Sequence, residues 1–401
     1  MKIPIKRVFS ILFIFLFSIN LHALEMPSLE DVFSIKSEGN PIQEEDITGS
    51  AVISLGLLFS GCTPESPVYN EALGQYLLLK NEVEKYSDLN QYEFGEKILE
   101  LMYENVLTKY DLLSTEIQVM LTAGKYNCVS ASLLYLALAT DCGLDARVQE
   151  TEKHAFITLY LDDGQKIDVE TTNPYGFNPG KKKELPQGNN SVSKKYVTVP
   201  KNYYSNRKEA SKLKAISIIA KNRCKLMGDK RDYKNAIPLG ASAYLFVQNE
   251  KEKDLVRQDF DKLCGNFAID CYNEGQSNQA LDFFEEIFES YGKTKLLDTR
   301  YNDITFNNIV TFCNQGQIEE AREFFVRRAP NLDSKTEAEI KEMIHHGEIV
   351  RIHNQAANLV NQKKYGEGLQ IISDALIENP NETILKNDYA RIKKFIELQA
   401  K

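Results

Sequence analysis

A cysteine, a histidine and two carboxylates follow one another in the middle of the sequence. His154 comes 26 residues after Cys128, and Asp168 and Glu170 come 14 and 16 residues after His154. A thiol can act as a nucleophile when an imidazole takes its proton and a carboxylate orients the imidazole ring. These residue types in this order predict a Cys–His–acid site. A small core cysteine and a structural histidine are the alternative interpretation.

The segments around these residues predict elements that bring them together. An almost entirely apolar stretch from Cys128 to about Thr140 predicts a buried helix that begins at the thiol, where the helix dipole favours thiolate. Residues 145–150, 154–161 and 165–171 predict strands, the last two joined as a hairpin. A buried helix followed by antiparallel strands predicts an α+β fold.

These motifs resemble the transglutaminase-like core, a domain of papain-related thiol enzymes, over about residues 120–180. Three segments carry the resemblance: Asn127-Cys128-Val129-Ser130 at the helix start, His154-Ala155-Phe156 as a His-Ala-aromatic motif, and Val169-Glu170-Thr171-Thr172-Asn173 in place of an Asp-Pro-Thr segment. The resemblance implies a fold in which a central helix packs on an antiparallel sheet.

The resemblance also implies roles for single residues. Cys128 would be the nucleophile, His154 the base, and Glu170 the acid where the family has aspartate, with Asp168 as the alternative acid. The family also needs donors to an oxyanion; the Cys128 backbone N–H would be the first, and Tyr126 or Asn127 the second.

The N-terminal residues 1–23 predict a secretory signal peptide. They combine a basic start with an apolar run from Val8 to Phe17, and Ala23 is a possible cleavage position. The run is shorter than the roughly 20 residues of a comfortable transmembrane helix, so a retained anchor is the lesser alternative. We therefore expect an exported protein, periplasmic or associated with the cell envelope, with no membrane contact beyond this segment.

Composition narrows the classes of partner and cofactor. The net charge of −9 argues against a nucleic-acid-binding protein. We see no zinc-ligand spacing, phosphate-binding glycine loop or dinucleotide fingerprint, so we expect no metal or cofactor. Cys264 and Cys271 are seven residues apart, which is about 10.5 Å along one helix. A disulfide tolerates about 7 Å between Cα atoms, so we expect no bridge there and no disulfide framework.

Residues 207–401 predict an all-α domain of helical repeats. Four turn-and-helix starts recur, and their small residues are spaced by 44, 41 and 47 positions at Ala236, Ala280, Ala321 and Gly368. They resemble degenerate tetratricopeptide repeats, whose period is about 34 residues. Stacked helix pairs of this kind usually present a groove to a protein or peptide partner, although they can also just cap a neighbouring domain.

Together these patterns predict a signal peptide (1–23), a transglutaminase-like domain with an N-terminal helical subdomain (24–206) and a repeat domain (207–401). The leading hypothesis is an exported thiol hydrolase or acyltransferase whose helical arm recognises a protein. The alternative is a non-catalytic scaffold that binds protein partners through its repeats. A surface-attached structural protein is a third, weaker hypothesis.

Overall fold

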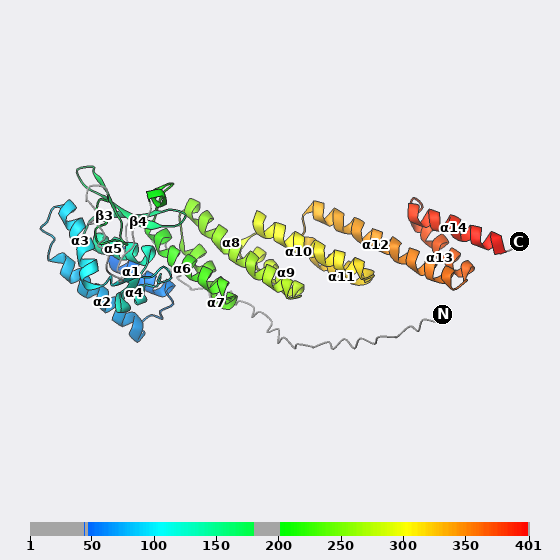
Figure 1. The fold of residues 1–401 in the computed structure, drawn as a ribbon, viewed down its shortest axis with the longest axis horizontal. Coiled ribbons are helices and arrows are strands. Elements are labelled where there is room, and N and C mark those ends of the chain that lie inside the picture. The colour runs from blue at the N-terminus through cyan, green and yellow to red at the C-terminus, as the bar shows by residue number, and fades with distance from the viewer. Residues whose placement is uncertain (1–43, 45–46, 180–200, 400–401) are drawn as a thin grey trace, which may run out of the picture.

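The computed structural model describes residues 44, 47–179 and 201–399. The predicted signal peptide lies outside these residues. A mixed α+β unit forms one end of the molecule, and an arm of paired helices extends from it to the C-terminus (Figure 1). No helix within the described residues is long and apolar enough to cross a membrane.

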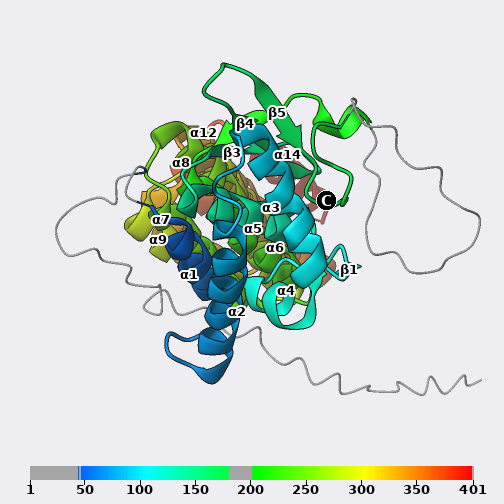
Figure 2. The ribbon, with the colours of Figure 1, turned by 90° about the vertical axis from the view of Figure 1, so that its left-hand side faces the viewer.

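The α+β unit is built around one helix, α5 (Cys128–Asp141), as predicted. Its residues from Val129 to Ala139 are all buried, because helices cover its sides and the sheet covers its remaining face (Figure 2). The surrounding helices are α1 (Gly49–Phe59), α2 (Pro67–Glu84), α3 (Gln91–Asn105) and α4 (Ile117–Ala123).

The sheet is antiparallel, with strands in the order β5-β4-β3-β6. The three predicted strands form, and Thr158 of β4 pairs with Asp168 of β5. The fourth strand was not predicted, because three residues are too few to show an alternating pattern. A separate parallel pair precedes α5. The strands are β1 (Lys109–Tyr110), β2 (Lys125–Tyr126), β3 (Asp145–Glu150), β4 (Ala155–Tyr160), β5 (Lys166–Val169) and β6 (Lys208–Ala210).

The arm consists of successive helices that pack as antiparallel pairs. A short 3-10 helix, η3 (Lys201–Tyr204), precedes β6, and another, η4 (Ala329–Asn331), follows α11. The helices are α6 (Lys212–Asp229), α7 (Tyr233–Phe246), α8 (Glu250–Asn273), α9 (Ser277–Tyr291), α10 (Lys295–Asn314), α11 (Ile318–Arg328), α12 (Ser334–Asn361), α13 (Tyr365–Glu378) and α14 (Thr383–Gln399).

The four predicted repeat starts share one turn geometry. At each, a residue with positive φ ends one helix and a buried small residue follows in the next. Each turn also contains a backbone hydrogen bond from an N–H to the carbonyl five residues earlier, the pattern of a Schellman motif. The bonds join 232 to 227, 276 to 271, 317 to 312 and 364 to 359. The helical-repeat organisation of the arm is therefore confirmed.

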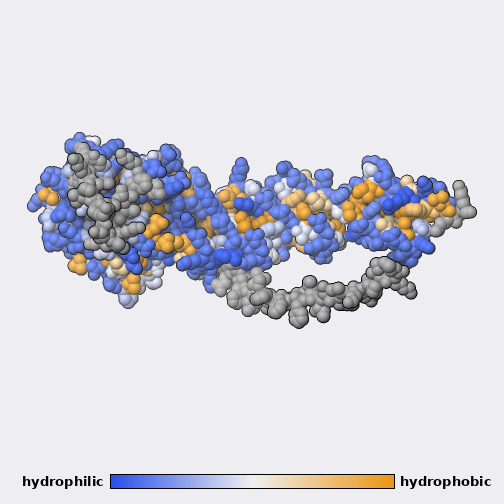
Figure 3. Space-filling view, viewed as in Figure 1, coloured by the Kyte–Doolittle hydropathy of each residue, from blue (hydrophilic) through white to orange (hydrophobic). Residues whose placement is uncertain are grey.

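The hydrophobic core is continuous across the predicted boundary at residue 206. One cluster of buried side chains extends from Ile47 to Ile304, and α6 contributes to it from the start of the arm. Two smaller clusters hold the outer helices. Hydrophilic residues cover most of the face in Figure 3, with hydrophobic groups interspersed along the arm. Helix α8 contains both Cys264 and Cys271, and all seven cysteines are free.

Candidate active site

Cys128 occupies the first position of α5, and the chain caps the helix immediately before it. The side-chain Oδ1 of Asn127 accepts hydrogen bonds from the N–H groups of Val129 (2.9 Å) and Ser130 (3.1 Å). The Asn127 N–H donates to Ser130 Oγ at 3.0 Å, which completes a capping box. The thiol is thereby fixed at the positive end of the helix dipole.

Gly124 makes the tight entry to this helix possible. It ends α4 with φ of 68°, a left-handed conformation that glycine adopts without strain. A Cβ atom at this position would lie 2.2 Å from Thr108 Oγ1 and 2.8 Å from the carbonyl oxygen of Val106. Only glycine fits, and the chain therefore turns directly from α4 into β2 and Cys128.

His154 immediately precedes β4, and its side chain is buried. Its backbone N–H donates to Thr151 Oγ1 at 3.0 Å, and its carbonyl accepts from the Thr151 N–H at 2.8 Å. The ring Nε2 lies 2.7 Å from Glu170 Oε2, and both side chains are only 4% exposed. The ring also stacks beside Phe156, with centroids 6.1 Å apart. The imidazole orientation is therefore fixed from several sides.

Glu170 follows β5 in a tight turn that faces its carboxylate toward His154. Its Oε1 accepts from the Thr172 N–H at 3.0 Å and from the Thr172 hydroxyl at 2.6 Å. Its backbone N–H donates to the Gly176 carbonyl, and a Cβ on Gly176 would lie 2.0 Å from the Glu170 carbonyl oxygen. The turn thus needs glycine at 176 and holds the longer glutamate side chain in place.

The two buried ionisable groups favour each other's charged forms. Burial alone would lower the pKa of the His154 imidazole, but hydrogen bonds with Cys128 and Glu170 raise it to about 9. Burial would raise the pKa of the Glu170 carboxyl, but hydrogen bonds from His154, Thr172 and Tyr204 hold it below its usual range. At neutral pH the structure therefore favours an imidazolium between Cys128 and a carboxylate.

Helix α5 is joined to the strands behind the thiol. Ser132, one turn after Cys128, lies with its Oγ 2.9 Å from Thr171 Oγ1 and 3.3 Å from the Ala155 carbonyl. Tyr103 donates to the Thr171 carbonyl at 3.0 Å. These buried bonds fix the spacing between the helix that carries the cysteine and the strands that carry the histidine and the acid.

Asp168, the alternative acid, is used elsewhere. Its Oδ1 accepts from Thr158 Oγ1 at 2.8 Å, and its Oδ2 accepts from Arg207 Nη1 at 2.7 Å. The structure thus places Glu170, and not Asp168, against His154. The reason is the strand register, which sets Asp168 opposite Thr158.

The two residues expected as second oxyanion donors have other partners. The Asn127 N–H is bonded to Ser130 Oγ, and its side-chain Nδ2 donates to the Leu112 carbonyl at 3.1 Å, so it acts as a helix cap. Tyr126 is fully buried, with its hydroxyl 2.9 Å from that of Tyr103. Neither side chain points a free donor at the thiol, because capping and core packing already use them.

A cavity of about 670 Å³ opens onto Cys128 and His154. The loop after β3 forms one wall, through residues 150–153, and α6 forms another, through Ile218, Lys221 and Lys225. The sequence did not predict this contribution from α6, because the helix lies about 90 residues after the cysteine and carries no motif. The cavity provides the space in which a substrate carbonyl could approach the thiol.

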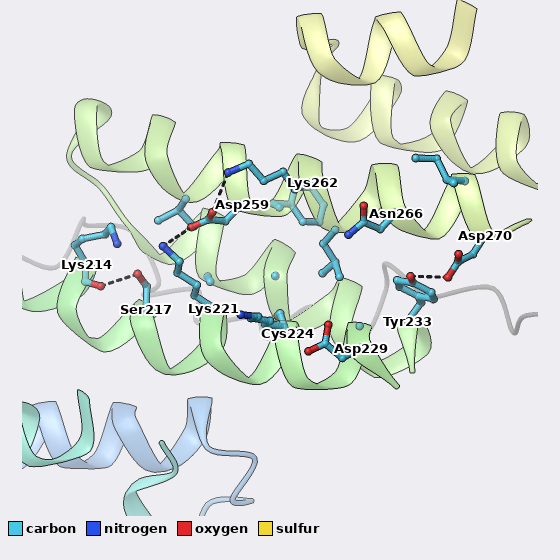
Figure 4. Close-up of a pocket in the computed structure, with 18 residues that line it drawn as sticks. Lys214, Ser217, Lys221, Cys224, Asp229, Tyr233, Asp259, Lys262, Asn266 and Asp270 are labelled. Carbon is cyan, nitrogen blue, oxygen red and sulfur yellow. Dashed lines mark hydrogen bonds and ion pairs between the residues drawn. The ribbon is translucent and has the colours of Figure 1, made fainter. Parts of the chain in front are cut away.

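A second cavity, of about 490 Å³, lies in the arm between α6, α7 and α8 (Figure 4). Lys221 lines both cavities and pairs with Asp259 of α8 at 3.1 Å. Apolar side chains such as Phe260 and Leu263 line its interior. One face of α6 thus lines the thiol cavity and the adjacent face lines the arm cavity.

Tyr204 is a site residue that sequence reasoning missed. Its hydroxyl donates to Glu170 Oε2 at 2.6 Å. It lies 34 residues after Glu170, and the chain outside the described residues separates the two, so no local pattern could have indicated it. Thr172 was visible in the quoted motif, although its role in holding Glu170 was not.

The arrangement contains the parts needed for covalent acyl transfer. Within the described residues, no group of three or more His, Cys, Asp or Glu side chains is arranged to hold a metal ion. The thiol, the imidazole and the carboxylate form one chain of hydrogen bonds. Such a chain can activate a nucleophile and protonate a leaving group.

Comparisons with known proteins place this chain in no family. No protein-family model matches the sequence, and no curated protein matches it. A solved structure similar to this chain is titled "Crystal structure of menin reveals the binding site for Mixed Lineage Leukemia (MLL) protein". The TM-score is 0.32 at 11% identity, over 75% of this chain and 88% of that one. A likeness of this size carries no argument about fold or function.

Proposed function

We propose that the protein is an exported thiol hydrolase or acyltransferase with a transglutaminase-like core. The observation that carries the proposal is the hydrogen-bonded series from the partly exposed Cys128 to the buried pair of His154 and Glu170. The glutamate is one methylene longer than the family's aspartate, and the turn that holds Glu170 Oε1 at Thr172 accommodates this difference. Residues 1–23 motivate the assignment to export.

The first half-reaction forms a thioester on the enzyme. The Cys128 thiolate attacks a substrate carbonyl, and the oxyanion is stabilised by the Cys128 backbone N–H, which has no partner within its own helix. The His154 imidazolium then gives its proton to the leaving amine while Glu170 keeps the ring oriented. In the second half-reaction, water or an amine attacks the thioester with His154 as the base.

A small activated ester tests this chemistry without a known substrate. Incubation with p-nitrophenyl acetate should give a burst of nitrophenol and an acetyl thioester at Cys128, identified by mass spectrometry of peptides. Cys128→Ala should abolish both. The matched control is Cys142→Ala, which removes the half-buried cysteine that follows the other end of α5 and should leave the burst unchanged. A burst that survives Cys128→Ala would refute the proposal.

The arm cavity favours a second candidate function, a scaffold that binds a protein partner without catalysis. The cavity is large enough for apolar side chains, and lysines such as Lys262 lie at its rim. A partner captured by the full-length protein should then be lost on Lys262→Glu and retained on Cys128→Ala. Loss on Cys128→Ala instead would favour a covalent or substrate interaction at the thiol.

A further inference from the structure

Two donors share one oxygen of the Glu170 carboxylate. His154 Nε2 lies 2.7 Å from Oε2, and the Tyr204 hydroxyl donates to the same atom at 2.6 Å. Thr172 uses the other oxygen. The carboxylate that orients the imidazole is therefore itself held by a residue from a different part of the chain.

The Tyr204 ring packs against two rings, that of His154 just before β4 and that of Phe156 within β4. It packs edge-on against His154, with centroids 6.0 Å apart, and against Phe156 at 5.0 Å. Three residues after Tyr204, the Arg207 guanidinium lies over the Phe156 ring, 5.6 Å from its centroid. Arg207 also forms an ion pair with Asp168 at 2.7 Å. These contacts fix the segment from η3 to β6 across the acid side of the site.

We propose that Tyr204 is a positioning residue of the thiol site, whose hydroxyl holds the Glu170 carboxylate and limits how tightly that carboxylate retains the proton of His154. The inference rests on the proposed function, because it concerns the same Cys128–His154 pair. It adds a fourth group to the hydrogen-bonded series, one that neither the motifs nor the resemblance indicated.

The expected direction follows from electrostatics. A donated O–H neutralises part of the carboxylate charge and brings its positive end near the imidazolium, so it disfavours the protonated ring. Removal of the hydroxyl should make the imidazolium harder to deprotonate. A base that holds its proton too tightly transfers it poorly to a leaving group, since general acids act best when their pKa lies near the working pH.

The ratio of two alkylation rates reports the charge of His154 directly. Iodoacetate is an anion and iodoacetamide is neutral, so an imidazolium beside Cys128 accelerates the first reagent selectively. In the wild-type protein, the iodoacetate-to-iodoacetamide rate ratio at Cys128 should fall as pH rises through about 9, where His154 loses its proton. Peptide mass spectrometry of the full chain assigns the alkylation to Cys128.

Tyr204→Phe removes the hydroxyl and keeps the ring. We expect the midpoint pH, at which the iodoacetate-to-iodoacetamide rate ratio is halfway through its fall, to rise by roughly half a pH unit. The matched control is Tyr160→Phe, which removes a hydroxyl that donates to Glu209 at 2.7 Å on the exposed side of the same sheet. This control should keep the wild-type midpoint.

A second variant keeps the proposal testable if Tyr204→Phe does not fold. Replacing Tyr204 with p-aminophenylalanine retains a donor at the same place, and its midpoint should lie at or near the wild-type value. An upward shift of roughly half a pH unit in this variant, which still carries a donor, would overturn the role of the Tyr204 hydrogen bond.

The outcomes separate the two proposals. A ratio that does not change with pH in the wild-type protein would refute both, since no imidazolium would then lie beside Cys128. A wild-type ratio that titrates, together with an unchanged midpoint in Tyr204→Phe, would overturn only the role of Tyr204.

Discussion

Both ends of the molecule contain a histidine hydrogen-bonded to a carboxylate, and the surroundings of the two pairs differ. In the α+β unit, His154 and Glu170 are each 4% exposed, and the ring also bonds Cys128. In the arm, His353 Nδ1 lies 2.5 Å from Asp388 Oδ2, with side chains 35% and 7% exposed. A histidine–carboxylate pair thus belongs to a buried candidate site in one region and joins two helices near the surface in the other.

A histidine–carboxylate pair alone therefore does not mark a candidate site. What distinguishes the His154 pair is that both side chains are buried and that the imidazole also bonds a thiol. Glu170 accepts four hydrogen bonds from His154, Thr172 and Tyr204. Asp388 also forms an ion pair with Arg391, whose side chain is 52% exposed. Water can replace a lost partner in the arm, whereas in the core a lost partner leaves donors unsatisfied.

The largest difference should appear when the carboxylate is removed. Glu170→Ala removes the acceptor of four hydrogen bonds from His154, Thr172 and Tyr204, and we expect the free energy of unfolding to fall by about 3–5 kcal/mol. Asp388→Ala should cost roughly 1 kcal/mol, because His353 and Arg391 can be hydrated. Urea unfolding followed by circular dichroism measures both, and equal losses would contradict the comparison.

Glycines with positive φ sharpen the comparison at the level of the backbone. Gly124 (φ 68°) and Gly275 of the arm (φ 76°) both end helices. A Cβ atom added at Gly124 would lie within 3 Å of neighbouring atoms, whereas one added at Gly275 would meet open space. Gly275→Ala should therefore cost about 1–2 kcal/mol, the strain of the left-handed conformation alone. Gly124→Ala should cost at least about 1 kcal/mol more and slow Cys128 alkylation. Thermal unfolding measures the stability of both variants. Equal losses of stability in Gly124→Ala and Gly275→Ala, with an unchanged rate of Cys128 alkylation, would show that the crowding at Gly124 is unimportant.

The His154 imidazole should also make the stability of the folded protein depend on pH. The raised pKa of folded His154 means that its contribution to stability is complete below 6.5, its ordinary value. The contribution is then lost as pH rises toward about 9. The stability difference between wild type and His154→Gln should shrink over this interval. A stability difference that stays constant over this interval would refute the assignment of the raised pKa to His154.

The smallest effect is expected at the alternative acid. Asp168→Asn weakens a partly exposed ion pair with Arg207 and should change stability by about 0–1 kcal/mol. The thioester burst should be unchanged, because Asp168 does not contact His154. A burst lowered as far as in Glu170→Ala would restore Asp168 as a functional acid.

The elements that carry the candidate site were predictable, because their signals are local. An apolar run after Cys128 and alternating strands joined by a short turn are visible within 50 residues. The alternation of side chains along a strand could not decide whether Asp168 or Glu170 is the acid, because residues two positions apart lie on the same face. It depends on the pairing of Thr158 with Asp168 and on the turn that packs Gly176 against Glu170.

The remainder of the site depends on residues far away in the chain. Tyr204 and the α6 side chains that line the cavity reach Cys128 only through tertiary packing, and a single sequence carries no signal for that. The assignment of Asn127 to an oxyanion hole overlooked a competing role, because an asparagine before a helix is also a favoured cap.

Alkylation of Cys128 by iodoacetamide at pH 6 tests the central claim most directly. If His154 stabilises the thiolate, Cys128 should react faster than the half-buried Cys142 of the same protein, and His154→Gln should slow Cys128 by about 10²-fold or more. His353→Gln should leave the rate unchanged. Equal rates at Cys128 and Cys142 in the wild type, with no dependence on His154, would contradict the account.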